Sequence, residues 1–150
     1  MSGATEPALT APHKMAYTYK RSLGPVLGRF FTAIRDRRIL GVRRPDGTVM
    51  VPPKEYDPDS AAALEELVEV GPGGEVRSWA WVEQPRPQQP LDRPFAYALI
   101  QLDGADTAML HVVDAGSESA MATGMRVEAR WSDEATGMIT DLCFVPETAA

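Results

Sequence analysis

The sequence predicts a mostly β protein, in which an N-terminal helix and a short hairpin precede a small closed barrel of five or six strands. Three observations predict it: one helical apolar stripe near the N-terminus, short β-type runs through the second half, and turn residues between those runs. A chain of 150 residues can bury one real core. We expect an arm over 1–16, the helix and hairpin over 17–63, and an OB-fold barrel over 64–150.

The helix is expected over Ser22–Arg38. Its apolar residues recur at spacings of three and four, which places them on one face: Leu23, Leu27, Phe30, Phe31 and Ile34. Ser22 is a good N-cap residue, and Pro25 is tolerated in the first turn, where its missing N–H has no helical partner. The arginines at the other end suit the negative end of the helix dipole.

A hairpin is expected next, with strands at Ile39–Val42 and Thr48–Val51. The turn residues between them are Arg44–Gly47, and Pro52-Pro53 stops the second strand. A helical turn is expected at Asp57–Ala63, with Asp59 or Ser60 as its cap.

The rest of the chain reads as β. The expected strands are Leu64–Val70, Val76–Val82, Phe95–Leu102, Ala108–Val113, Met125–Trp131 and Ile139–Phe144. The stretch 71–74 is a tight turn, and the proline-rich stretch 83–93 is a loop because proline cannot donate to a strand ladder. Short strands with one long loop suit an OB-fold.

Charge and cysteine content narrow the function class. The formal net charge of -6 argues against nucleic-acid binding, which depends on Lys and Arg neutralising phosphates. Eight of the 15 Lys and Arg residues lie between Lys20 and Arg44, whereas every charged residue from Glu55 to Glu75 is acidic; such asymmetry favours local recognition of an anion or a partner. A single cysteine, no secretory signal and no apolar run of membrane-spanning length lead us to expect a cytoplasmic protein.

The chemistry-bearing residues have ordinary structural interpretations. Cys143 ends an apolar strand and is expected to be a buried, inert thiol. His111 alternates with strand residues and is expected to bond a backbone carbonyl rather than act as a general base. Trp79 and Trp81 share one face of their strand; we favour core or a subunit interface over a platform for stacking bases.

The order of these elements resembles a known family. The residues that carry the resemblance are Leu27-Gly28-Arg29-Phe30-Phe31, Ile39-Leu40-Gly41, Gly47, Val51-Pro52-Pro53, Gly74-Glu75-Val76, residues 95–104 and Gly124-Met125-Arg126-Val127. They resemble the bacterial and archaeal family of unknown-function proteins that join an N-terminal helix, a rubredoxin-like zinc ribbon and an acyl-CoA-associated OB-fold.

The chain departs from that family at the zinc ligands. Registered on Gly47 and Pro52-Pro53, the four cysteine positions hold Arg43, Asp46, Asp57 and Ser60. Structural zinc takes Cys or His ligands, so we expect a degenerate, zinc-ribbon-like hairpin with no metal. Apolar burial against the helix or a partner is then expected to hold it, by Leu40, Val42, Val49, Val51 and Tyr56.

The resemblance implies a non-catalytic accessory subunit of a thiolase-like acyl-CoA enzyme, including the aldolases that cleave CoA-linked side chains in steroid breakdown. It implies a hetero-oligomer with a sterol-carrier-type thiolase-like protein, and a CoA thioester bound in the complex rather than a cofactor of this chain. In the complex that the resemblance implies, CoA or the partner is expected to bind Arg35, Arg37, Arg38, Arg43 and Arg44, and an equal alternative is that these arginines form a solvated basic surface. A partner interface is expected at Leu27, Phe30, Phe31, Trp79 and Trp81. Two rivals stay open: a single-stranded nucleic-acid binder, and a stand-alone acyl-CoA binder or thioesterase.

Overall fold

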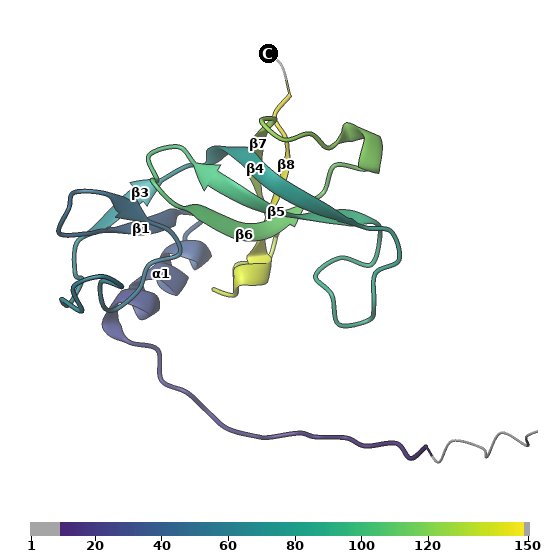
Figure 1. Cartoon of the computed structure of the whole chain (residues 1–150), viewed down its shortest axis with the longest axis horizontal. Helices are drawn as coiled ribbons and strands as arrows, with labels where there is room; N and C mark the ends of the chain where they lie inside the picture. The colour runs from purple at the N-terminus through teal and green to yellow at the C-terminus, as the bar shows by residue number, and fades with distance from the viewer. Residues whose placement is uncertain (1–9, 149–150) are drawn as a thin grey trace, which may run out of the picture.

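Two sheets and one helix make up the fold (Figure 1). The computed structural model describes residues 10–148, and within that range the chain has one α-helix and eight strands. The elements are α1 Pro25–Arg35, β1 Ile39–Arg43, β2 Val49–Met50, β3 Leu67–Val70, β4 Gly73–Val82, β5 Phe95–Leu102, β6 Ala108–Val113, β7 Arg126–Trp131 and β8 Leu142–Pro146, with short 3-10 helices η1 Glu118–Ala120 and η2 Ile139–Asp141.

The arm predicted over residues 1–16 is described only from residue 10 onward, because residues 1–9 lie outside the described part of the chain. Residues 10–23 form neither helix nor strand and are exposed. In Figure 1 they run from α1 away from both sheets. Between residues 10 and 148, no helix has the length and apolar character needed to cross a membrane.

The start of α1 differs from the expectation. The N-cap residue is Gly24 instead of Ser22, and no side chain at the cap position bonds the helix. The carboxylate of Glu55 instead accepts the backbone N–H groups of Val26 and Leu27, each at 3.0 Å. A Cβ atom on Gly24 would lie 2.2 Å from Oε1 of Glu55, so glycine is needed for this contact. The cap comes from far along the chain, which is why local sequence patterns miss it.

The helix ends at Arg35, three residues before the expected end. The N–H of Arg37 donates to the carbonyl of Ile34, and that of Arg38 donates to Ala33, which together form a Schellman motif. Arg37 has a φ of 57°, a left-handed conformation that usually selects glycine. The backbone therefore turns sharply into β1 directly after the helix.

Strands β1, β2 and β3 form a small antiparallel sheet in the order β2-β1-β3, called here the small sheet. The predicted hairpin is confirmed, with Val42 opposite Met50. The strand expected at Leu64–Val70 forms as β3 but pairs with β1, so it does not contribute to the barrel. The helical turn expected at Asp57–Ala63 is replaced by a turn closed by a single bridge between Tyr56 and Ala63.

The remaining five strands close into a barrel in the order β4-β5-β6-β8-β7, with β4 paired to β7. This confirms the predicted fold class, a mostly β chain with an N-terminal helix and an OB-fold barrel. The bounds of β5 and β6 match the expectation. Strand β4 begins earlier, at Gly73, and the residues before β8 form η2 instead of a strand.

One apolar core connects the two sheets. It contains Phe30 and Ile34 of α1, Ile39 and Val70 of the small sheet, and the inward residues of the barrel. A second, smaller cluster lies under the start of the helix and contains Val26, Val42, Met50 and Leu64. The division into segments 1–16, 17–63 and 64–150 stays a prediction, but this core crosses its second boundary.

Candidate functional site

Most of the predicted arginine site lies on and around β1, and two of its members pair with acidic residues, one in β3 and one just before it. Arg38 donates to Glu69 at 2.6 Å, and Arg43 donates to Glu66 at 2.8 Å. Leu40 is opposite Glu69 in the antiparallel register, so Arg38 reaches Glu69 diagonally, whereas Arg43 lies beside Glu66, whose carbonyl accepts the Arg43 N–H at 2.8 Å. The contact with Glu69 raises the pKa of Arg38. Two arginines of the basic stretch thus form ion pairs with two glutamates of the acidic stretch.

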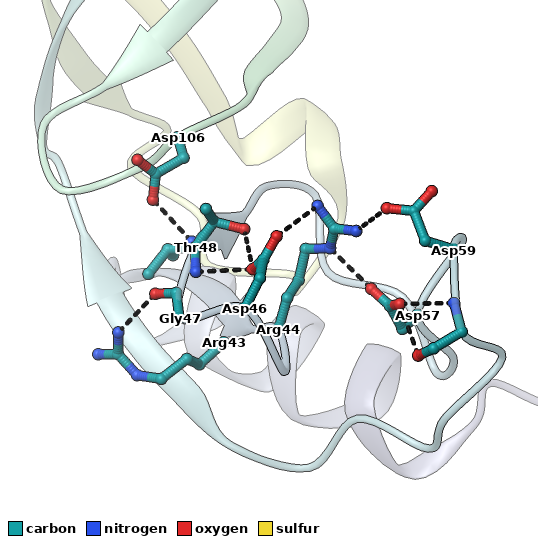
Figure 2. Close-up of polar contacts among 10 residues, drawn as sticks. Arg43, Arg44, Asp46, Gly47, Thr48, Asp57, Asp59 and Asp106 are labelled. Carbon is teal, nitrogen blue, oxygen red and sulfur yellow. Dashed lines mark hydrogen bonds and ion pairs between the residues drawn. The ribbon is translucent and has the colours of Figure 1, made fainter.

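Arg44 is the centre of a denser ion-pair cluster, which Figure 2 shows. Its Nε donates to Oδ1 of Asp57 at 2.7 Å, a second nitrogen reaches Asp59, and a third lies 3.4 Å from Asp46. The Asp57 side chain is only 4% exposed, and it also accepts the N–H and hydroxyl of Ser60. These hydrogen bonds from Arg44 and Ser60 lower the pKa of Asp57 to about 2.

The cluster joins two turns that are separate in the sequence. The first turn, residues 43–48, is ordered by Asp46, which accepts the N–H and hydroxyl of Thr48 at 2.9 and 2.6 Å. The second turn, residues 57–62, is ordered by Asp57 and its bonds to Ser60. The Arg44–Asp57 pair links the first turn to the second, so it crosslinks the two turns without a covalent bond (Figure 2).

These two turns carry the four positions that the resemblance predicts to correspond to zinc ligands, and the residues present do not fit that ion. Arg43 and Ser60 are not ligands of structural zinc, and both carboxylates already serve the turns and Arg44. A guanidinium beside the would-be ligands also adds positive charge where a cation would have to bind. Across residues 10–148, no cluster of three or more His, Cys, Asp or Glu side chains is arranged to hold a metal.

Apolar burial also holds the small sheet, as the sequence indicated, with one exception. Val42, Val49 and Val51 are buried, and Leu40 is partly buried against the main core. Tyr56 was expected to join them but is 64% exposed, so that expectation is wrong. Its backbone pairs with that of Ala63 in an isolated antiparallel bridge.

The other two arginines lie at the junction of α1 and β1. Arg35 is 3.6 Å from the carboxylate of Asp36, an exposed neighbour. Arg37 donates to the backbone carbonyl of Ser132 at 3.2 Å, in the segment after β7. Within the described residues Arg37 has no acidic partner within 4 Å. Its backbone adopts the strained left-handed conformation described above.

The predicted partner-interface residues divide into two groups. Phe30 is 1% exposed and belongs to the chain's own core, so it is not available to a partner. Leu27 and Phe31 are partly buried on α1, and Trp79 and Trp81 are partly buried on β4. Trp79 and Trp81 pack against the main core, as their shared strand face predicted. The indole N–H of Trp81 donates to Glu83 at 2.7 Å.

His111 has the structural role expected from its strand pattern. It is buried, and its Nδ1 accepts the N–H of Val112 at 2.7 Å, so its Nε2 carries the proton and donates to the carbonyl of Ile139 at 3.3 Å. Burial lowers the pKa of His111. Cys143 is partly buried on β8. Neither arrangement is that of an activated nucleophile with its base.

One feature escaped the sequence analysis: a cavity lined by residues of the 83–94 loop, β5, β6, β7, η2 and β8. A sequence signal that could have drawn attention to this region is the pair of leucines that lie opposite each other on β5 and β6, Leu99 and Leu110. Both are exposed, and Leu110 lines the cavity. Which of two outward leucines borders a cavity depends on how the barrel closes, and residue patterns do not encode that.

The closed five-stranded barrel with its preceding helix and small sheet defines an OB-fold protein. Residues 67–132 match the family model described as "ChsH2, C-terminal OB-fold domain", so this part of the chain is similar to that OB-fold domain. No curated protein matches the chain.

Two experimental structures are similar to the chain over most of its length. One, titled "Ltp2-ChsH2(DUF35) aldolase", has a TM-score of 0.63 and 21% identity, and the match covers 85% of this chain and 98% of that chain. The other is a protein of unknown function from the DUF35 family of Sulfolobus solfataricus, with a TM-score of 0.63, 18% identity, and coverage of 83% and 87%. At these identities the similarity shows the fold.

Proposed function

We propose that this chain is the non-catalytic partner subunit of a thiolase-like acyl-CoA enzyme. The observation that carries the proposal is the extent of the structural match. It covers 85% of this chain, which is more than the barrel strands between Gly73 and Pro146 can supply, so the match extends into the helix and small sheet. A barrel alone would support only a fold, because OB-folds serve many functions.

The finer proposal is that the partner is a sterol-carrier-type thiolase-like protein that acts on CoA thioesters in lipid or steroid breakdown. In this proposal the partner holds the catalytic residues and the present chain supports assembly and the acyl-CoA channel. The arrangement of His111 is consistent with this division, since both of its ring nitrogens are bonded to the backbone.

Arg37 is the arginine best suited to meet an anion outside the chain. Its left-handed backbone costs roughly 1–2 kcal/mol for a non-glycine residue, and a glycine would remove that cost. Strain of this kind is found at functional sites more often than elsewhere. By contrast, Arg38, Arg43 and Arg44 already have carboxylate partners. We therefore assign the external contact, to CoA phosphate or to a partner carboxylate, first to Arg37.

Co-expression tests the proposal most directly. The chain and a thiolase-like protein encoded beside it should elute as one complex on size exclusion, and the complex should cleave or condense acyl-CoA. Two separate peaks at micromolar concentration, with the thiolase-like protein fully active alone, would contradict the proposal. Acyl-CoA turnover by the isolated chain, or salt-dependent binding of oligonucleotides, would favour one of the two rival functions instead.

Arg37→Ala, with Arg86→Ala as the matched control, locates the contact. Arg86 lies in the exposed 83–94 loop and is far from α1 in the sequence. A raised Michaelis constant with an intact complex would identify a CoA contact, and loss of co-purification would identify a partner contact. If both variants behave as wild type, the assignment of Arg37 is wrong.

A further inference from the structure

The barrel closes incompletely between β6 and β8. Every other pair of neighbouring barrel strands shares at least three residue pairs, whereas β6 and β8 share one, Val113 with Phe144. The two strands therefore separate on one side of this pair. The space between them is bordered by residues 110–112 of β6, by η2 and by the first residues of β8.

A cavity of about 340 Å³ occupies this region. It lies at the lower end of the size range of small-molecule sites. Aliphatic and aromatic side chains form much of its wall, including Leu91, Leu110, Val112, Trp131, Ile139 and Leu142. Tyr97 adds a ring beside Val112, its cross-strand partner.

The buried polar groups in the wall are already bonded within the chain. His111 uses both ring nitrogens, as described above. The carboxylate of Asp141 accepts the N–H groups of Thr136 and Gly137 and the hydroxyl of Thr136, at 2.6–2.8 Å. Arg130, at the mouth, donates to Asp114 at 2.6 Å. A ligand in this cavity would find apolar contacts and no buried polar group that requires a partner.

We propose that this cavity is a binding site for a compact, uncharged hydrophobic group, a ring system or a branched hydrocarbon. The volume of the cavity limits the ligand to a small one. Contact with the apolar wall removes apolar surface of the ligand from water, which favours binding. Leu110 and Ile139 line the cavity and are 64% and 37% exposed. A bound ligand of this kind would cover both side chains further. The proposal does not rest on the partner-subunit function.

Cys143 provides a direct reporter. It is the only cysteine of the chain, it lines the cavity and it is partly buried. Indole, a neutral bicyclic compound, is the probe, and imidazole is the polar control compound. Saturating indole should slow alkylation of Cys143 by iodoacetamide, followed by intact mass, whereas imidazole at the same concentration should leave the rate unchanged. NMR titration of the full chain with indole supplies the affinity.

Two variants test the location. Leu110→Ala should weaken indole binding by about fivefold, because it removes part of the apolar wall. Leu99→Ala is the matched control: Leu99 is opposite Leu110 in the strand register, is exposed, and does not line the cavity. Thr140→Trp changes an exposed residue of the wall and should fill the space and abolish binding.

The proposal is overturned if indole neither protects Cys143 nor shifts NMR signals of residues 110–112 and 139–143. It is also overturned if Leu99→Ala and Leu110→Ala weaken binding equally, because the compound would then be adsorbed to an exposed apolar face. Circular dichroism of each variant keeps a folding defect separate from a binding defect.

Discussion

The barrel and the small sheet are stabilised in different ways. The barrel buries apolar residues from five strands, including Phe95, Ile100 and Phe144, and its ion pairs lie at partly exposed positions outside that core. The small sheet has three short strands, and β2 contains only Val49 and Met50. A sheet of this size buries too little apolar surface by itself. It uses contact with the shared core, a crosslink between its turns and bonds to a barrel loop.

That barrel loop covers the open edge of β2. The carboxylate of Asp106 accepts the N–H of Val49 at 2.7 Å, and the N–H of Asp106 donates to the carbonyl of Val49 at 2.8 Å. The hydroxyl of Thr107 bonds both backbone groups of Val51. The small sheet therefore depends on hydrogen bonds and ion pairs, whereas the barrel depends on burial of apolar side chains. The following predictions measure these two contributions to stability separately.

The largest expected effect is in the barrel core. Phe144→Ala should reduce the free energy of unfolding by about 3–5 kcal/mol, because it leaves a cavity among fully buried side chains. Phe31→Ala, at a partly buried position of α1, is the matched control and should cost clearly less. Urea unfolding followed by circular dichroism measures both. Equal losses would show that the barrel core does not dominate stability.

The next effect is in the crosslink of the small sheet. Arg44→Met should destabilise the protein more than Arg43→Met. Loss of Arg44 leaves the buried Asp57 carboxylate without its guanidinium partner, whereas loss of Arg43 affects only the exposed Glu66. Thermal unfolding at low and high salt compares the two variants. Indistinguishable melting temperatures for the two variants would mean that the Arg44 cluster is not a crosslink.

Acid sensitivity gives the same crosslink a pH signature. The pKa of Asp57 is about 2 in the folded protein and near its ordinary value of 3.8 in the unfolded chain. Its contribution to stability is therefore fully present above about pH 4 and is lost as the pH falls towards 2. Asp57→Asn should flatten the decline of stability across this window relative to wild type. A decline of unchanged slope would contradict the assigned pKa.

A smaller effect is expected at the start of α1. Glu55→Ala removes a carboxylate that accepts two N–H groups at the positive end of the helix, and it should cost about 1 kcal/mol. Ser22→Ala is the control and should have no effect, because the N-cap residue is Gly24. If Ser22→Ala is the costlier change, the helix begins where the sequence pattern placed it.

The smallest effect has the opposite sign. Arg37→Gly should stabilise the folded chain, by at most about 1 kcal/mol, because glycine adopts the left-handed conformation without strain but is more flexible when unfolded. The same change should impair the external contact proposed for Arg37. Chemical denaturation and co-purification of one variant thus report stability and function separately.

The parts of the fold that local patterns determine were predictable. Strands β5 and β6 have the expected bounds, since each is a continuous β-type run between turn residues. The hairpin of β1 and β2 is also as expected. The pairing of β3 with β1 was not, because a strand pattern does not identify its neighbour, and opposite charges such as Arg38 and Glu69 are recognisable as partners only once the register is known.

The candidate sites were predictable to a smaller extent. The arginines were identified by residue type, but three of the five have internal carboxylate partners that lie about 13 to 31 residues away in the sequence. The Glu55 cap and the cavity between β6 and β8 depend on tertiary geometry alone. Residue patterns therefore identified the side chains that can bind an anion. The fold determined which of these side chains already pair with a carboxylate of the same chain.

Metal analysis tests most directly whether ion pairs and the shared core hold the small sheet without zinc. The protein is purified without an affinity tag, dialysed against chelator, and measured for zinc and for its melting temperature before and after dialysis. The account predicts zinc well below one equivalent per chain and an unchanged melting temperature. One equivalent of zinc that survives the chelator, or a melting temperature that falls on its removal, would contradict it.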